Sequence, residues 1–221
     1  MFVNQENYFS ILKETQAANA TLVAVSKTKP LEAIKELYDL GHRDFGENYV
    51  QELLDKEAQL PKDIRWHFIG HLQGNKVKFI APFVHLIHGI DSFKLLKEVN
   101  KQGTKINRVI DVLLQVHIAL EETKFGFSED ELLNTNVEHE LHELNNVRVT
   151  GLMGMASFTD DMNQVRSEFK TLKNIFNKHA QLKTKNYKLK TLSMGMSADY
   201  KIALEEGSNM IRVGSLLFGK R

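Results

Sequence analysis

The 221-residue chain carries 29 Lys and Arg residues against 28 Asp and Glu, and its net charge of +1 predicts neither a nucleic acid nor an anionic membrane as partner. It contains no cysteine, which excludes a disulfide, a thiolate nucleophile and a cysteine-ligated metal site. No secretory signal pattern begins the chain, and its apolar stretch at 79–90 is too short to cross a membrane. We therefore expect a soluble, cytoplasmic protein, and the length predicts a single domain over residues 1–221.

Short apolar runs alternate with longer segments of helical period, a pattern typical of parallel strands joined by helices. An amphipathic helix is predicted over 4–15, ahead of the first strand. The predicted strands cover 21–26, 43–45, 65–69, 84–88, 109–117, 147–153, 190–193 and 210–213. Helices are predicted over 31–40, 47–59, 74–81, 92–102, 128–143, 161–180 and 198–206, with a short one near Ser215. Eight alternating pairs indicate an α/β fold, a single TIM-type (β/α)8 barrel with an extra N-terminal helix.

The turns after the last two predicted strands have the composition of a phosphate site. In barrels of this type, ligands bind at the carboxyl ends of the strands, and phosphate often binds after strands seven and eight. Those turns contain Gly195, Met196 and Ser197, and then Gly214 and Ser215. They supply backbone N–H groups, that of Met196 included, with hydroxyls beside them. Ordinary βα turns use the same residue types, so this alternative stays open for any one turn. No Walker-type loop is present, which favours a monophosphate ester over a triphosphate.

Lys27 directly follows the first predicted strand, so its amine is expected over the barrel mouth. Partial desolvation beside cations such as Lys29 or Arg212 would favour a neutral, nucleophilic amine. Taken alone, Lys27 could equally be an exposed loop lysine without a chemical role. Together with a phosphate site across the same mouth, it fits a phosphorylated aldehyde, and pyridoxal 5′-phosphate is such a molecule. The sequence therefore predicts this cofactor, held as a Schiff base on Lys27.

Arg212 lies inside the last predicted strand, two residues before the proposed phosphate glycine. If it faces the pyridine nitrogen of the cofactor, its permanent positive charge disfavours protonation there and weakens the cofactor as an electron sink. An ion pair inside the barrel is the alternative role for this residue.

The histidines do not predict a metal site. His67 and His71 are four residues apart, but Gly70 and the change from strand to loop prevent the helical geometry that such a pair needs. His85 and His88 are expected on opposite faces of the fourth strand, because side chains alternate with a period of two. No metal ligand is therefore predicted.

Seven motifs, in order along the chain, carry a resemblance to a known family. They are AVSKTKP at 24–30, FGENYVQE at 45–52, WHFIGHLQGNK at 66–76, EETKFGF at 121–127, GLMGMAS at 151–157, LSMGMSADY at 192–200 and IRVGSLLFG at 211–219. In these motifs the chain resembles the pyridoxal phosphate homeostasis proteins, relatives of the N-terminal barrel of alanine racemase.

The resemblance implies roles for individual residues of this chain. Lys27 is implied as the Schiff-base lysine, and Arg212 as the residue that approaches the pyridine nitrogen. The implied phosphate ligands are Ser197, Gly214 and Ser215. Asn48 of FGENY is implied to lie near the cofactor ring.

Two functions follow, and they differ in whether the protein turns over a substrate. In the first, it binds pyridoxal phosphate for intracellular vitamin B6 homeostasis without substantial catalysis, with pyridoxal phosphate-dependent apoenzymes as candidate recipients. The alternative is a pyridoxal phosphate-dependent amino-acid racemase. Alanine racemase takes a second base, a tyrosine, from an additional β domain of the partner subunit, and no residues for such a domain follow the predicted barrel. We therefore expect the first function and a monomer. A phosphosugar enzyme, a third possibility, would leave Lys27 without a role.

Overall fold

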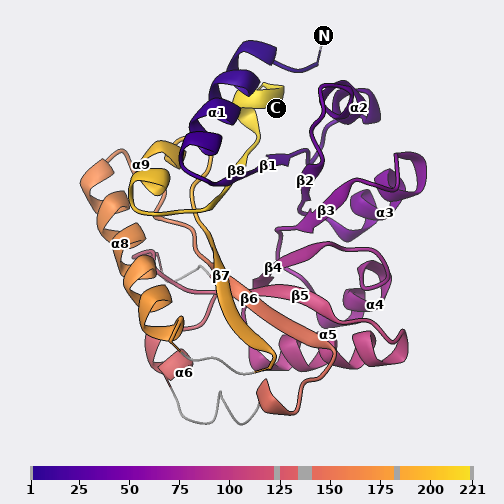
Figure 1. Ribbon diagram of the computed structural model, residues 1–221, viewed down its shortest axis with the longest axis vertical. Helices are drawn as coiled ribbons and strands as arrows, with labels where there is room; N and C mark the ends of the chain where they lie inside the picture. The colour runs from indigo at the N-terminus through magenta and orange to yellow at the C-terminus, as the bar shows by residue number, and fades with distance from the viewer. Residues whose placement is uncertain (1, 122–124, 134–140, 182–184, 220–221) are drawn as a thin grey trace.

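The computed structural model describes residues 2–121, 125–133, 141–181 and 185–219, and their strands form a closed parallel barrel (Figure 1). Neighbouring strands follow the chain order, and β1 pairs with β8 to close the barrel. The strands are β1 (Thr21–Val25), β2 (Asp44–Glu47), β3 (Arg65–Phe68), β4 (Leu86–Ile90), β5 (Ile110–Gln115), β6 (Val147–Met153), β7 (Tyr187–Ser193) and β8 (Met210–Val213). The predicted (β/α)8 fold is confirmed.

Helices connect the strands and cover the outside of the barrel (Figure 1). They are α1 (Gln5–Ala17), α2 (Leu31–Asp39), α3 (Val50–Gln59), the 3-10 turn η1 (Gly74–Lys76), α4 (Val77–Ile80), α5 (Phe93–Lys105), α6 (Glu129–Leu133), α8 (Met162–His179), α9 (Tyr200–Glu205) and α10 (Ser215–Phe218). Thus α1 is the additional helix predicted ahead of the first strand. Of the helix predicted over 128–143, residues 134–140 lie outside the described part of the chain, as do residues 122–124 of the EETKFGF motif.

Two strand boundaries differ from the prediction for identifiable reasons. Val84 is buried, but its N–H donates to the carbonyl of Ile80 in the turn after α4, so β4 begins two residues later than predicted. Strand β7 begins at Tyr187 rather than at residue 190. Its exposed Lys188 alternates with buried neighbours, which is the period of a strand with one solvated face. The lysines in the first half of β7 interrupt the apolar run by which strands are recognised in the sequence.

The N-terminal helix is attached to the C-terminal end of the chain. The side chain of Asn4 caps α1 by accepting from the N–H of Asn7 at 2.9 Å. The backbone N–H of Asn4 donates to the carbonyl of Leu217 at 2.8 Å, and the amide of Asn7 donates to that of Leu216 at 3.0 Å. Because α10 begins at Ser215, these bonds hold one of the predicted phosphate residues in place.

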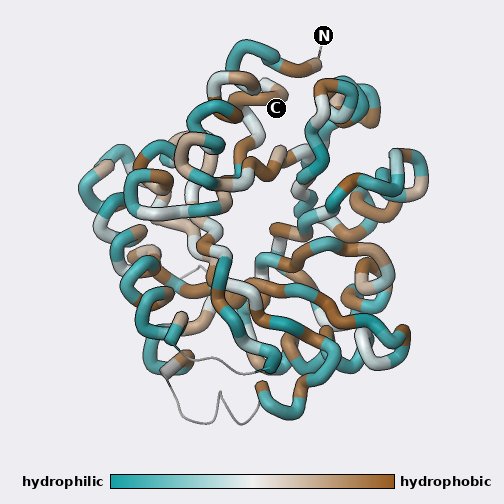
Figure 2. The backbone as a smooth tube through the Cα atoms, viewed as in Figure 1, coloured by the Kyte–Doolittle hydropathy of each residue, from teal (hydrophilic) through white to brown (hydrophobic). Residues whose placement is uncertain are grey.

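The core consists of two parts. The larger one fills the layer between the strands and the surrounding helices, where Figure 2 shows hydrophobic residues along both. The smaller one lies inside the barrel, on the strand faces turned to its axis, and contains Val23, Leu86, Leu113, Met153 and Met210. Polar side chains occupy the rest of this interior, which is unusual for a barrel whose interior is normally filled by branched apolar residues.

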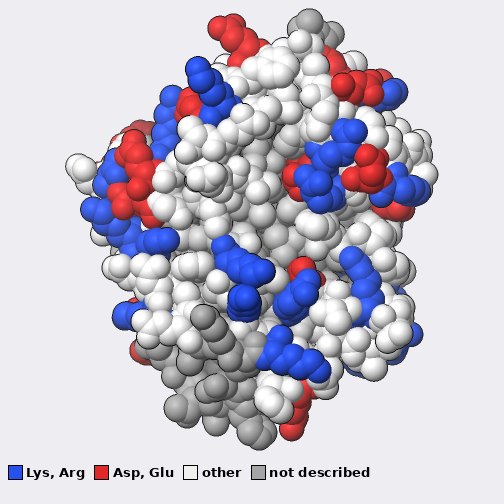
Figure 3. Space-filling view, in the orientation of Figure 1, with Lys and Arg blue, Asp and Glu red and all other residues white. Residues whose placement is uncertain are grey.

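The surface carries charges of both signs. On the face shown in Figure 3, Lys and Arg side chains are interspersed with Asp and Glu and separated by uncharged surface. Several of these charges form exposed ion pairs, such as that between Lys35 and Asp39. Among the described residues, no helix has the length and apolar content to cross a membrane.

Candidate functional site

A cavity of about 690 Å³ lies at the carboxyl ends of the strands, within the size range of small-molecule sites. Its walls come from the ends of six strands, β1 to β3 and β6 to β8, and from the loops that follow them. All of the residues predicted for the cofactor line it: Lys27, Asn48, Met196, Ser197, Arg212, Gly214 and Ser215. The fold therefore brings together positions that span most of the chain.

The two predicted phosphate turns contact each other at one side of this cavity. The N–H of Gly214 donates to Ser197 Oγ at 3.2 Å, which joins the turn after β7 to the start of α10. Gly195 has a φ of +97°, and a Cβ there would lie 2.5 Å from the Cβ of Ala203. Only glycine fits this tight turn. The N–H of Met196, expected to contribute to the phosphate site, instead donates to the carboxylate of Asp199 at 2.6 Å.

The loop that carries Lys27 is anchored on both sides. Lys27 itself is half-buried and lines the cavity. Before it, Ser26 donates its hydroxyl to Glu47 Oε1 at 2.5 Å. After it, the N–H of Thr28 donates to Glu52 Oε1 at 2.5 Å. Thr28 has a φ of +62°, a strained conformation for a β-branched residue, and the bond to Glu52 offsets that strain.

Lys56 of α3 joins these anchors into one buried ion cluster. Its Nζ donates to Glu47 Oε1 at 2.8 Å, to Glu52 Oε1 at 2.6 Å and to the carbonyl of Ser26 at 2.8 Å. Burial raises the pKa of Glu47, while the Lys56 ammonium opposes that shift. Losing any partner of such a cluster leaves a buried charge uncompensated, so the cluster holds the Lys27 loop firmly.

Lys29, the other lysine of the SKTKP turn, has a different environment. Its Nζ donates to the carbonyls of Phe218 at 3.0 Å and Gly219 at 3.1 Å, at the C-terminal end of α10. An ammonium is favourable there because helix carbonyls at that end lack intrahelical partners. The structure thus assigns Lys29 a contact with α10.

Asn48 contributes a buried acceptor beside the cavity. Its side-chain Oδ1 has no hydrogen-bond partner among the described residues. The backbone of Asn48 is pressed against Gly70, where a Cβ would lie only 2.2 Å from the Asn48 carbonyl oxygen. An unpaired buried carbonyl is costly, so a donor from a ligand in the cavity would stabilise this arrangement.

Arg212 reaches the cavity from inside the barrel. It is 4% exposed, and burial lowers its pKa to about 10, an effect that the Asp199 carboxylate opposes. The guanidinium is therefore charged at neutral pH. Nη1 donates to Ser193 Oγ at 2.5 Å and Nη2 to the carbonyl of Gly154 at 3.0 Å. These partners are neutral acceptors rather than the carboxylate of the ion pair that the sequence left open.

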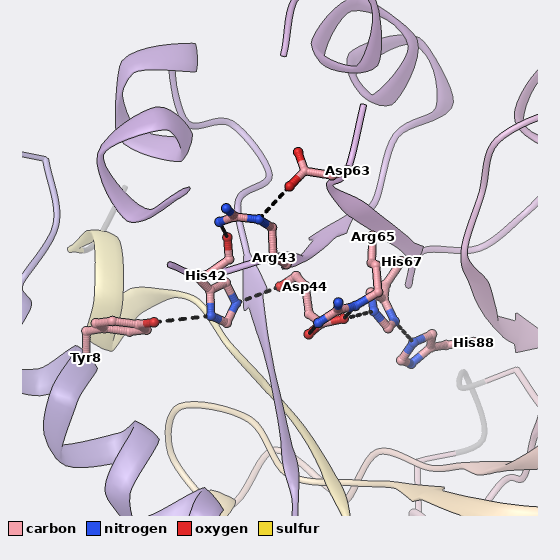
Figure 4. A network of polar contacts seen from close by, with 8 residues as sticks. All are labelled: Tyr8, His42, Arg43, Asp44, Asp63, Arg65, His67 and His88. Carbon is pink, nitrogen blue, oxygen red and sulfur yellow. Dashed lines mark hydrogen bonds and ion pairs between the residues drawn. The ribbon is translucent and has the colours of Figure 1, made fainter. Parts of the chain in front are cut away.

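Sequence reasoning missed a polar chain that continues from Arg212 through the barrel interior. Beyond Ser193, His88 Nδ1 lies 3.2 Å from Ser193 Oγ, and His88 Nε2 lies 3.0 Å from His67 Nδ1. His67 Nε2 in turn lies 3.0 Å from Asp44 Oδ1 (Figure 4). These residues occupy inward-facing strand positions, so the period-two pattern could have identified them. Among the described residues, no cluster of three or more potential ligands could hold a metal ion.

The chain is similar to known proteins over most of its length. The model of the alanine racemase N-terminal domain family matches residues 5–221. A pyridoxal phosphate homeostasis protein from Aquifex aeolicus is 44% identical over 203 residues, covering 91% of this chain and 87% of that protein. The human protein of that name is 39% identical over 220 residues, covering 95% and 79%.

Among solved structures, PipY from Synechococcus elongatus is 32% identical, and each chain is covered almost completely, at 97% of this one and 99% of PipY. The TM-score is 0.89 for PipY without PLP and 0.85 for PipY with PLP bound.

A first prediction concerns acid stability and Asp44, which begins β2. Burial raises the pKa of Asp44, but hydrogen bonds from Arg65 and His67 outweigh burial and hold that pKa well below its usual range. The ionised form therefore stabilises the fold fully above about pH 4, the unfolded-state value, and this contribution is lost as the pH falls toward the folded-state pKa. Asp44→Asn should lower the free energy of unfolding by about 3 kcal/mol at pH 7.

Urea unfolding of the parent and of Asp44→Asn between pH 3 and 7 measures this effect. The difference between the two proteins should shrink as the pH falls below about 4. Asp39→Asn, which removes an exposed pair with Lys35, serves as control and should change little. A difference that stays constant over this range would contradict the assignment.

Proposed function

The chain belongs to the family of pyridoxal phosphate homeostasis proteins, and on this premise we propose that it binds pyridoxal 5′-phosphate at the barrel mouth and serves intracellular homeostasis of this vitamin B6 cofactor. One observation carries the proposal. A loop lysine, two turns rich in backbone N–H groups and a buried arginine converge on one cavity of about 690 Å³. The unpaired Asn48 Oδ1 at the same cavity fits a ligand that brings a hydrogen-bond donor.

Lys27 is the proposed attachment point. When bound, pyridoxal phosphate supplies an aldehyde carbon that a lysine amine can attack to form a Schiff base. Two observations favour Lys27 over Lys29. The bonds of Ser26 and Thr28 hold the loop on either side of Lys27, whereas the amine of Lys29 contacts carbonyls of α10.

The phosphate is proposed to bind at the joined turns of Ser197, Gly214 and Ser215. The hydroxyls of Ser197 and Ser215 can donate to a phosphate oxygen, and the N–H of Gly214 can do so once it leaves Ser197 Oγ. Charge-assisted bonds of this kind are stronger than neutral ones. Met196 would contribute its N–H only if Asp199 released it. We therefore propose Met196 as a wall of the site, 37% exposed at the edge of the cavity.

Arg212 and Asn48 are proposed to face the ring end of the cofactor. A guanidinium that stays charged at neutral pH disfavours a second positive charge on a ring nitrogen beside it. This weakens electron withdrawal by the ring, which substrate turnover needs. We accordingly propose binding without substantial catalysis, rather than amino-acid racemisation.

Reversible binding is what a homeostatic role requires, and the rim of the cavity supports it. Phe158 is 96% exposed and Met162 is 40% exposed, although both line the cavity, so a path to solvent is open. We propose that the protein works in the cytoplasm as a monomer and that pyridoxal phosphate-dependent apoenzymes receive the released cofactor.

The attachment point is tested by chemical trapping. The protein reconstituted with pyridoxal phosphate should be yellow, and borohydride reduction should fix one pyridoxyl group on the peptide that contains Lys27. Lys27→Ala should lose the label yet keep its thermal unfolding temperature, because a residue at the mouth contributes little to the core. Lys29→Ala is the matched control and should keep the label. A label found on Lys29, or no cofactor bound after reconstitution, would falsify the assignment.

The phosphate site is tested with Ser197→Ala and Ser215→Ala. Each loses a hydrogen bond to a charged group, worth about 1.5 to 3 kcal/mol, so affinity should fall roughly tenfold to a hundredfold while the Schiff base still forms. Fluorescence titration of the apoprotein with pyridoxal phosphate measures this. Ser167→Ala, an exposed position on α8, should bind like the parent. If the double variant also binds like the parent, the phosphate lies elsewhere.

The absence of substantial turnover is tested with L-alanine, L-serine and L-threonine in deuterated water. Exchange of the α-proton should be slow, and the D-enantiomer should not accumulate, because the charged Arg212 limits electron withdrawal by the ring. Mass spectrometry follows the exchange and chiral chromatography the D-amino acid. Sustained racemisation at about 1 per second or faster, an ordinary enzymatic rate, would favour the racemase instead.

A further inference from the structure

The polar chain inside the barrel has two ends whose hydrogen-bonding roles are fixed. At the mouth, the guanidinium of Arg212 can only donate, and its Nη1 donates to Ser193 Oγ. At the opposite end, Asp44 can only accept while ionised, and two bonds from Arg65, at 2.7 Å and 2.5 Å, keep it ionised. Between these ends lie Ser193, His88 and His67, each of which can both donate and accept. We call the five residues from Arg212 to Asp44 the interior relay, and Figure 4 shows its part from His88 to Asp44.

One arrangement of hydrogens gives Ser193, His88 and His67 an acceptor for each of their side-chain hydrogens. The hydroxyl of Ser193, whose oxygen accepts from Arg212, donates to His88 Nδ1. His88 then carries its hydrogen on Nε2 and donates to His67 Nδ1. His67 likewise carries its hydrogen on Nε2 and donates to Asp44 Oδ1. Every bond points from the mouth to Asp44, and both histidines are neutral.

The competing arrangement is less favourable on two grounds. A proton added to His67 would reverse its bond to His88, and His88 would then donate to Ser193 Oγ. The Ser193 hydroxyl would be left without a described acceptor, and the barrel interior would hold a second positive charge in addition to Arg212, paired with an Asp44 carboxylate that already accepts from Arg65. The burial of His88 also disfavours charge in this region, since it holds the pKa of His88 well below its usual value.

Charged and titratable groups from several strands face the two histidines. They are Asp44 on β2, Arg65 on β3, His85 just before β4 and Arg212 on β8, and Asp111 on β5 acts on His85. His85 contacts the His67 ring edge-on at 5.3 Å between centroids, but it is exposed and takes no part in the interior relay. It is a nearby histidine that lies just before the strand of His88, which makes it a matched control.

We propose that His88 is a positioning residue for Arg212: acting through Ser193, it fixes the guanidinium at the floor of the cavity, while Asp44 holds both histidines in the Nε2–H form. The inference rests on the proposed function, because Arg212 is the residue assigned there to the cofactor ring. Without the His88 acceptor, the Ser193 hydroxyl is free to rotate, and Arg212 Nη1 loses an acceptor of fixed direction. The bond from Nη2 to the backbone carbonyl of Gly154 then remains.

The hydrogen arrangement is tested in the apoprotein by nitrogen-15 NMR of the histidine rings at pH 7.5, with assignment by single substitution. His67 and His88 should both show the Nε2–H form, and the Arg212 guanidinium signals should be sharp. His88→Phe should broaden the Arg212 signals, whereas His85→Phe should leave them unchanged. A Nδ1–H form of His88, or Arg212 signals insensitive to His88→Phe, would overturn the proposal whether or not the protein binds cofactor.

Cofactor binding gives an independent readout that separates positioning from a general structural role. His88→Phe should weaken pyridoxal phosphate binding at least about tenfold and shift the midpoint of the pH profile of its absorbance. His88→Asn places an amide oxygen near the former Nδ1 and should bind within about threefold of the parent. His85→Phe should match the parent in both affinity and midpoint.

A double-substitution cycle tests whether His88 acts through Ser193. Ser193→Ala alone should weaken binding as much as His88→Phe, and the two together should weaken it no further. Additive losses would overturn the proposal. If His88→Phe does not fold, the comparison of Ser193→Ala with His88→Asn decides instead, since the former should weaken binding and the latter should not. If the parent itself binds no cofactor, the proposed function fails while the NMR result still decides the relay.

Discussion

A permanently charged guanidinium inside a closed barrel needs acceptors, because a buried charge without them costs several kcal/mol. Arg212 donates to Ser193 and to the carbonyl of Gly154. Ser193 then needs an acceptor for its own hydrogen, so the need for acceptors extends further down the barrel. Ser193 must pass on its own hydrogen, His88 does the same, and the series ends only at a carboxylate. One arginine at the mouth thus explains why much of the barrel interior is polar where branched apolar side chains are the rule.

The two sides of the cavity are held by different physical means. On the β1 side, Lys56 and two glutamates anchor the loop of Lys27, so that a strained residue next to the lysine keeps its conformation. On the β8 side, a series of hydrogen bonds through the neutral side chains of Ser193, His88 and His67 holds Arg212. The ion cluster fixes backbone and the interior relay fixes a side chain. The rim of the cavity is exposed and apolar at Phe158 and Met162.

These two modes of anchoring fit the proposed function, in which the protein holds a reactive aldehyde and releases it again. In the proposed function, a rigid lysine loop favours capture at one position, and a charged arginine proposed to lie beside the ring limits the chemistry that follows. An open rim keeps the bound molecule within reach of solvent and of other proteins. Membership in the family of pyridoxal phosphate homeostasis proteins and the shared fold with PipY support a role in pyridoxal phosphate homeostasis.

The sequence by itself determined the fold class, because the alternation of short apolar runs with helical segments is a local pattern that can be recognised in short stretches of sequence. It also placed Lys27 and the two turns proposed for phosphate at the same end of the barrel, since residues that directly follow a parallel strand gather there. Only the tertiary structure decided the partners of Arg212, the contact of Lys29 with α10 and the unpaired oxygen of Asn48. Ser193 and His88 are 105 residues apart, and their contact depends on strand register and on which side chains face the barrel axis. Such contacts arise only when the barrel closes, which no local pattern encodes.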